Sequence, residues 1–259
     1  MDLNNLIIFF VLIIFGLFFY KYFPIFLNKY NLKILIDDEL KKPQAFHEFP
    51  ISTSGGLGIF FSFLILYSYL YLFNHEIYYD FLTFCSLFFL LGFSDDLKLN
   101  VKPKFRLGLM ILFLITLVIS NNFFIENTGI TFLNRFLEID IFALFFVCLC
   151  FLFIINGSNL VDGYNGLLSI HVLIILINLF FINYLNGNKE LALFIFYIIL
   201  IITIFLKYNF PQASVFLGDG GSYFLGSLTA VSVIKTSIAN PTISPFYFCI
   251  LLFYLFFEV

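Results

Sequence analysis

The segment "NGSNLVDGYNGL", Asn156 to Leu167, separates two long apolar runs with three Asn, three Gly and one Asp. The run before it reads "LFFVCLCFLFII", and the run after it reads "LSIHVLIILINLFFI". Predominantly apolar stretches of about 20 residues can cross the hydrocarbon core of a bilayer as helices. The pattern therefore predicts two membrane-spanning helices joined by a polar loop at one membrane surface.

The composition of the whole chain favours the same class of protein. Apolar residues make up 62% of the 259 positions and charged residues 11%, whereas a soluble domain is about half apolar and about a quarter charged. The chain has too little polar surface to cover a soluble globule of its size. We predict an all-α polytopic membrane protein, with residues 1–259 forming a single integral-membrane domain that has the lipid bilayer, and no nucleic acid, as a partner.

Nine apolar stretches are long enough to be candidate spans. Backbone N–H and C=O groups in lipid must be satisfied within the chain, so each stretch should be a helix. The first stretch lacks a basic leader and a cleavage site, so we expect it to be retained rather than removed as a signal peptide. The expected spans are Asn4–Tyr22, Gly55–Phe73, Tyr79–Phe93, Phe105–Ser120, Ile139–Ile155, Leu167–Leu185, Leu191–Tyr208, Gly221–Ile234 and Phe246–Val259.

The loops between these spans alternate in charge. Loops 28–54, 94–104, 156–166 and 209–220, with their flanks, hold ten of the thirteen Lys and Arg residues. Basic residues accumulate in cytoplasmic loops, so this set should face the cytoplasm and the N-terminus should lie outside. The same loops carry the unusual polar residues, so the sequence gathers them on one face.

The first polar motif is "FSDDLKLNVKPKFRL", Phe93 to Leu107. Its adjacent acids, Asp95 and Asp96, repel each other unless a cation or a proton compensates them, so the pair suits Mg²⁺ or a shared proton. Lys104 and Arg106 are candidates for holding phosphate. The alternative is a solvated helix end followed by lysines among lipid headgroups.

The opening segment supplies the second motif. Asn156, Asn159 and Asp162 are spaced three residues apart, so on a helix they form one slanted polar ridge. Amide groups can bind a base, sugar or phosphate, and a carboxylate can bind a metal. The alternative is a helix end capped by Gly163, which leaves the cost of a polar ridge reaching into the span unexplained.

Two further motifs lie at expected helix starts. "VFLGDGGSYFLG", Val215 to Gly226, places Asp219 just before a helix expected to begin near Gly221, where backbone amides favour an anion. Asp219 could instead be only a helix cap. "HEFPISTSGG", His47 to Gly56, offers His47 as a phosphate contact, although a lone loop histidine is more often merely exposed. Aspartates, basic residues and Gly-rich helix ends on one face suit metal-assisted phosphoryl transfer.

The three motifs "GFSDDLKLNVKPKFRL", "NGSNLVDGYNGL" and "FLGDGGSYFLG" resemble, in order and topology, those of the polyprenyl-phosphate N-acetylhexosamine-1-phosphate transferases. This MraY/WecA-like family is glycosyltransferase family 4. The resemblance implies a UDP-N-acetylhexosamine donor, a polyprenyl (undecaprenyl) phosphate acceptor and Mg²⁺, with Mn²⁺ as the alternative ion. It also implies a bacterial plasma-membrane enzyme whose active face is cytoplasmic and which initiates a cell-envelope glycan, with a homodimer as one candidate assembly.

Roles follow from the resemblance residue by residue. They make Asp95, Asp96 and Asp162 the catalytic candidates, and Asp219 and Asp162 the metal-ligand candidates. The candidate substrate-binding residues are Asn156, Asn159, Lys104, Arg106, His47 and Gly163.

The chain departs from the family pattern in two places. "HEFPISTSGG" lacks the basic residue that relatives often place shortly before the Gly pair. The sequence ends at "FYLFFEV", without the histidine-containing loop and tenth span of the family pattern, so we expect a C-terminally incomplete, ten-helix-type fold with about nine spans. The first loop favours a simple UDP-N-acetylhexosamine over a muramyl-pentapeptide nucleotide.

Other functions remain open from sequence. They are a phospho-MurNAc-pentapeptide transferase of the same family, an inactive truncated homologue and a secondary transporter. A transporter would cluster its polar residues near the bilayer midplane rather than at one surface. A CDP-alcohol phosphotransferase would keep its acidic motif in one stretch, whereas these aspartates lie on three loops.

Overall fold

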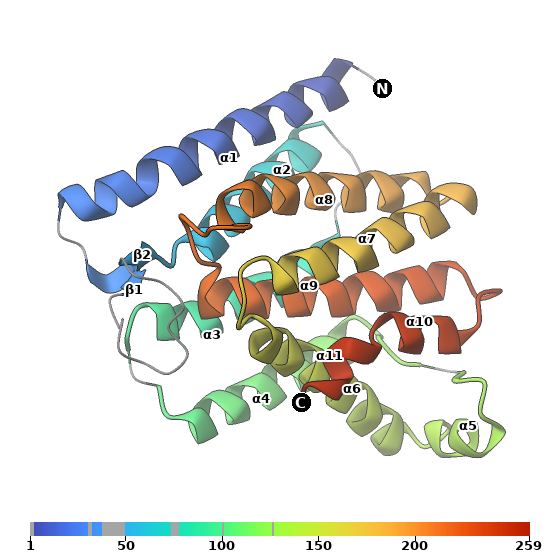
Figure 1. Cartoon of the computed structure of the whole chain (residues 1–259). Helices are drawn as coiled ribbons and strands as arrows, with labels where there is room; N and C mark the ends of the chain where they lie inside the picture. The colour runs from blue at the N-terminus through green and yellow to red at the C-terminus, as the bar shows by residue number, and fades with distance from the viewer. Residues whose placement is uncertain (1–2, 31–32, 38–49, 74–77, 100, 126) are drawn as a thin grey trace.

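The computed structural model describes residues 3–30, 33–37, 50–73, 78–99, 101–125 and 127–259 (Figure 1). The described chain is almost entirely helical, which confirms the predicted all-α membrane class. Its helices are α1 (Leu3–Lys29), α2 (Gly55–Leu72), α3 (Tyr79–Asp96), α4 (Pro103–Ser120), α5 (Thr131–Leu137), α6 (Asp140–Val161), α7 (Leu167–Leu185), α8 (Lys189–Asn209), α9 (Gly218–Ala239), α10 (Pro245–Leu251) and α11 (Phe253–Phe257).

Six helices are long and apolar enough to cross a membrane by length and composition: α1, α2, α4, α6, α7 and α8. α3 and α9 also match predicted spans, but they are less apolar because they pack mainly against protein. Every residue of α9 from Gly220 to Ile234 is buried. A helix enclosed by other helices can carry small and polar residues that lipid would not tolerate.

Two regions differ from the predicted elements. The expected last span, Phe246–Val259, is interrupted at Leu252 and forms α10 and α11 instead of one helix. α11 lies against α6 where Gly157 has no side chain, so the Leu255 carbonyl can approach closely. The loop after α4 contains α5, a short helix that the apolar pattern did not indicate.

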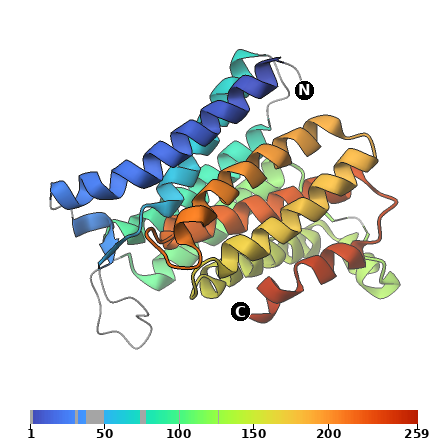
Figure 2. The ribbon, with the colours of Figure 1, turned by 45° about the horizontal axis from the view of Figure 1, so that its top comes forward.

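α9 is the central helix of the bundle. α3, α6, α2 and α7 pack around it, and Figure 2 shows it running through the middle of the ribbon. Close packing depends on glycines that face the backbone of a neighbour. Gly56 of α2 lies against Gly221, and Gly92 of α3 lies against Asp219 and Gly220. The start of α9 is therefore held tightly between two other helices.

A small sheet ties the first loop to the start of α9. Strand β1 (Ile36–Asp37) pairs antiparallel with β2 (Ile51–Ser52), after the 3₁₀ helix η1 (Lys33–Leu35). The Phe216 N–H donates to the Ser52 carbonyl at 2.8 Å, and the Gly56 N–H donates to the Leu217 carbonyl at 2.7 Å. These bonds place the end of the first loop beside the third polar motif.

Candidate functional site

Asp96 and Asp219 meet where α3 ends and α9 begins. Asp96 Oδ1 accepts the Asp219 backbone N–H at 2.8 Å, and Asp96 Oδ2 accepts the Gly220 N–H at 2.9 Å. The carboxylate thus satisfies two unpaired amides of the first turn and lies at the positive end of the helix dipole. The sequence placed Asp219 ahead of a helix beginning near Gly221. In the structure α9 begins at Gly218, and its cap comes from another helix.

Glycine is required where these two helices meet. Gly218 has φ +77°, a left-handed conformation that favours glycine. A Cβ at that position would lie 2.8 Å from Asp96 Oδ1. The glycines of "LGDGG" therefore let the backbone come close to Asp96 itself.

Asn159 joins α6 to the same helix start. Its amide nitrogen donates to Asp219 Oδ1 at 3.1 Å and to Ser222 Oγ at 2.9 Å. Ser222 is fully buried and in turn donates to the Asp219 carbonyl at 3.1 Å. The Asn159 N–H groups are thus used to orient Asp219, and the amide oxygen is left for other contacts. Sequence reasoning missed Ser222, because a serine one turn after Asp219 carries no distinguishing signal.

Asp162 is the C-cap residue of α6, and it lies close enough to Asp96 and Asp219 for their charges to affect its pKa. Burial raises its pKa well above the ordinary range, and the charges of Asp219 and Asp96 raise it further. Asp96 lies beyond the apolar part of α3, and burial raises its pKa to about 7, against the lowering effect of its two backbone amides. Three mutually repelling carboxylates indicate a site that a cation or proton would stabilise.

The other acid of the DD pair has a different partner. Asp95 forms an ion pair with Arg106, in the first turns of α4. The Arg106 guanidinium carbon lies 5.6 Å from the ring centroid of Tyr223, a buried residue of α9 that sequence reasoning also missed. Arg106 is therefore placed by a carboxylate and a ring, and Asp95 and Asp96 do not share one partner.

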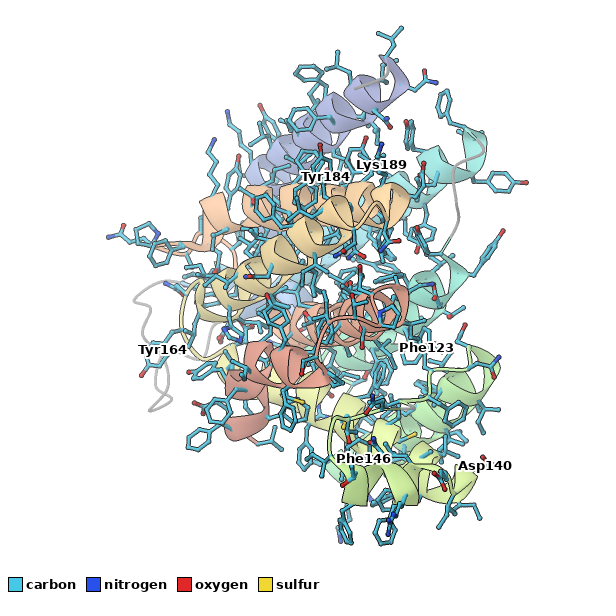
Figure 3. All side chains as sticks on the ribbon, turned by 90° about the vertical axis from the view of Figure 1, so that its right-hand side faces the viewer. Phe123, Asp140, Phe146, Tyr164, Tyr184 and Lys189 are labelled. Carbon is cyan, nitrogen blue, oxygen red and sulfur yellow. The ribbon has the colours of Figure 1, made fainter. Side chains whose placement is uncertain are left out.

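Among the described residues, Asn156, Lys104 and Gly163 are not joined to this cluster by a hydrogen bond or an ion pair. The Asn156 amide donates to the Leu152 carbonyl of its own helix at 2.9 Å. Lys104 and Gly163 are exposed, and Tyr164 projects from the bundle beside Gly163 (Figure 3). His47 lies outside the described residues. The structure thus unites Asp96, Asp162, Asp219 and Asn159, with Arg106 beside them through Asp95 and Tyr223.

The carboxylate oxygens of this cluster suit a metal ion whose remaining ligands come from a substrate. Within the described ranges, no three His, Cys, Asp or Glu side chains are grouped as a complete metal site. Mg²⁺ is usually held by one or two carboxylates, with waters and substrate phosphates as its remaining ligands. Asp219 and Asp162 supply oxygens of the required type, so this donor set fits such an ion.

The fold and the carboxylate cluster define a polytopic membrane protein with a polar site where three helices meet. A family model for glycosyl transferase family 4 matches residues 78–237, which include all three polar motifs. The chain belongs to glycosyl transferase family 4. This confirms the resemblance inferred from the motifs.

Among curated proteins, the chain is similar to phospho-N-acetylmuramoyl-pentapeptide-transferases. It is 35% identical over 169 residues to that of Streptococcus pyogenes serotype M6, covering 59% of this chain and 48% of the relative. It is 33% identical over 159 residues to that of Listeria monocytogenes serovar 1/2a, covering 58% of this chain and 49% of the relative. The chain thus spans about half the length of each of these relatives.

Proposed function

We propose that this chain carries the active site of a sugar-1-phosphate transferase. It moves the sugar phosphate of a UDP-N-acetylhexosamine or a related nucleotide sugar to polyprenyl phosphate at the cytoplasmic face of a bacterial plasma membrane. The observation that carries the proposal is the meeting of Asp96, Asp162 and Asp219 at the start of α9. Family membership supports the reaction class.

The reaction forms and breaks one bond at phosphorus. A phosphate oxygen of the lipid attacks the β-phosphorus of the nucleotide sugar, the bond to the α-phosphate oxygen breaks, and UMP leaves. The sugar C1–O bond survives, so the anomeric configuration is retained. A phosphate monoester has a second pKa of about 6 and is mostly a dianion at neutral pH, so the lipid needs no strong base.

The residues of the chain would contribute mainly positioning and charge. Asp96 holds the first turn of α9, and Asn159 orients the Asp219 carboxylate. Asp219 and Asp162 would hold Mg²⁺, which when bound neutralises pyrophosphate charge. Arg106 and Lys104, both near the start of α4, would provide positive charge for the phosphates. Positioning and electrostatic stabilisation are the main sources of rate in phosphoryl transfer.

Two donors fit this chemistry. The first loop favours a simple UDP-N-acetylhexosamine. The printed names of the relatives favour the phospho-N-acetylmuramoyl-pentapeptide donor at least as strongly. Both donors present the same uridine diphosphate to the carboxylates and differ only in the sugar and peptide.

A direct assay with both donors tests the proposal. Membranes carrying the chain would receive undecaprenyl phosphate, Mg²⁺ and either labelled UDP-GlcNAc or labelled UDP-MurNAc-pentapeptide, and lipid-linked product and UMP would be measured. Product should appear with one donor and vanish in Asp219→Asn. The matched control is Asp140→Asn, which makes the same change at the exposed far end of α6.

The same assay separates the competing functions. Correctly inserted protein that makes no product with either donor would count against the transferase function. Donor-independent solute or ion flux in proteoliposomes would instead favour the transporter alternative.

A further inference from the structure

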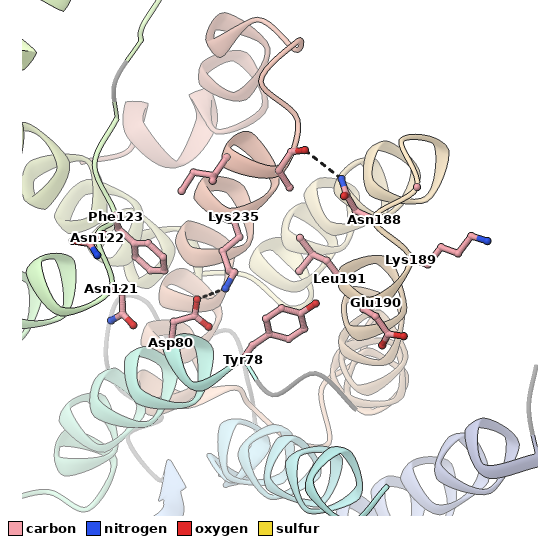
Figure 4. A pocket seen from close by; sticks show the side chains of 13 residues that line it. Tyr78, Asp80, Asn121, Asn122, Phe123, Asn188, Lys189, Glu190, Leu191 and Lys235 are labelled. Atoms are coloured by element: carbon pink, nitrogen blue, oxygen red, sulfur yellow. Dashed lines mark hydrogen bonds and ion pairs between the residues drawn. The ribbon is translucent and has the colours of Figure 1, made fainter. Parts of the chain in front are cut away.

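A pocket lined by charged, amide and apolar side chains lies at the end of α3 and α9 opposite the carboxylate cluster (Figure 4). It forms where α4 and α9 end and where α3 and α8 begin. Its volume is about 590 Å³, which lies within the range of roughly 300–1,000 Å³ typical of small-ligand sites. The proposed transferase reaction makes no use of this pocket.

An ion pair occupies its centre. Lys235 of α9 pairs with Asp80 of α3, and the two side chains are 24% and 10% exposed. The ammonium lies 4.8 Å from the ring centroid of Tyr78. A half-buried ion pair is weak evidence for a stabilising role, because an apolar pair of similar volume often gives the fold equal or greater stability. Ionisable residues buried in membrane bundles more often mark a binding or transport site.

Lys235 retains the capacity to bind an anion. Asp80 Oδ2 accepts from Lys235, and Asp80 Oδ1 accepts the Phe81 backbone N–H at 2.9 Å. An ammonium group has three N–H donors. In the part of the chain that the structure describes, Asp80 is the one hydrogen-bond acceptor paired with Lys235. An anionic group could therefore join Lys235 without displacing Asp80.

The pocket walls contribute hydrogen-bond acceptors. The Asn121 amide N–H groups donate to the Leu117 carbonyl at 2.8 Å and to Ser120 Oγ at 3.2 Å. The Asn188 amide N–H groups donate to Asn240 Oδ1 at 3.1 Å. Both amides line the pocket, and these bonds leave their oxygens as acceptors. A ligand with N–H or O–H donors would match them.

Among the described residues that line the pocket, the formal charges cancel. Asp80 and Glu190 are balanced by Lys235 and Lys189, all of which line it. A ligand with net charge would leave an uncompensated charge beside the largely buried Asp80–Lys235 pair, which is costly. A ligand that carries one charge of each sign avoids that cost.

We propose that this pocket binds the headgroup of an amine-bearing zwitterionic phospholipid. The phosphate contacts the Lys235 ammonium, and the lipid ammonium donates to the amide oxygens of Asn121 and Asn188. Phe123, Leu191 and Ile238 at the pocket wall contact the apolar part of the lipid next to its headgroup. Phosphatidylethanolamine meets these requirements, whereas phosphatidylcholine lacks N–H donors and phosphatidylglycerol carries net charge.

Lipid retention measures this preference directly. The full chain would be reconstituted in nanodiscs of phosphatidylcholine containing equal shares of phosphatidylethanolamine and phosphatidylglycerol, then extracted in mild detergent for native mass spectrometry. The variant is Asp80→Asn/Lys235→Gln, which removes both charges together and leaves no unpaired ion. The control is Lys207→Met, which removes another lysine that lies over a tyrosine ring, at 5.9 Å, but does not line this pocket.

We expect retained phosphatidylethanolamine to exceed both other lipids and to fall about tenfold in the double variant, which corresponds to ~1.4 kcal/mol. Retention in Lys207→Met should match the parent chain. Equal retention of the three lipids, or equal loss in both variants, would overturn the proposal. The proposal would also be overturned if inorganic phosphate alone fully protected residues 186–191 from hydrogen exchange. The ligand would then be a free anion.

Discussion

Asp80 and Lys235 join α3 to α9 sixteen residues away from the point where Asp96 and Asp219 join the same two helices. At about 1.5 Å per residue, these two attachments are roughly 24 Å apart. The helices run antiparallel and are tied near both ends. The position of the Asp219 carboxylate is therefore set by contacts along the whole length of α9.

Replacing Gly218 with Ala should disturb the Asp96 contact as well as the local backbone. Gly187 provides the comparison, because it has φ +85° and no atom within 4 Å of an added Cβ, whereas Gly218 has Asp96 Oδ1 at 2.8 Å. Gly187→Ala should cost about 1–2 kcal/mol of backbone strain. Gly218→Ala should cost more and should also lower transferase activity. Thermal unfolding in detergent and the donor assay measure both, and equal losses in the two variants would contradict a contact-specific effect.

Stability without ligand should depend on the protonation of Asp96. Its pKa in the folded chain is raised to about 7, above its value in an unfolded chain, so its contribution to stability is full below the unfolded pKa. That contribution is lost as pH rises through about 7. In the presence of a chelator, the melting temperature should rise between pH 8 and pH 6, and the rise should shrink in Asp96→Asn. A melting temperature independent of pH over this range would count against a raised pKa.

Asn159→Ala should affect turnover more than donor binding. The Asn159 amide orients Asp219 through a 3.1 Å hydrogen bond, and hydrogen bonds to charged groups contribute about 1.5–3 kcal/mol. We expect kcat to fall by about tenfold or more, while KM for the nucleotide sugar changes little. Asn156→Ala is the comparison on the same helix, because that amide is bonded to its own backbone. A rise in KM alone would assign Asn159 to nucleotide binding instead.

Arg106→Lys should weaken the site although it preserves the charge. Lysine cannot reproduce the planar guanidinium that pairs with Asp95 and lies over the Tyr223 ring. Activity should fall, and the midpoint of thermal unfolding should fall by a few degrees. Lys102→Arg, at an exposed position just before α4, should leave both unchanged. Full activity in Arg106→Lys would show that any cation at this place is sufficient.

The sequence predicted the helices well because lipid imposes a simple rule on length and polarity. Eight expected spans are single helices, whereas the stretch after Pro245 is broken where α11 packs against Gly157. The acidic motifs were found for the same reason: polar residues beside apolar runs are conspicuous. The pairing of charged residues that lie far apart in the sequence was not predicted. Asp80 meets Lys235 across 155 positions, and no local pattern specifies that partner.

The sequence also did not predict the roles of residues that act by positioning other residues. Asp96 reads as half of an acidic pair, but its two oxygens hold the backbone of a distant helix. Ser222 and Tyr223 follow "LGDGG" without any distinguishing signal. Only three-dimensional packing shows that they contact Asn159 and Arg106.

The enclosed position of α9 separates the site from changes in membrane thickness. A bilayer that is too thin or too thick for a helix is accommodated by tilting or by local deformation of the lipid, at a cost borne by helices that lipid touches. α1 and α4, which expose most of their spanning segments, would respond first. α9 meets protein along nearly all of its length. Such strain would reach Asp219 only after passing through the surrounding helices.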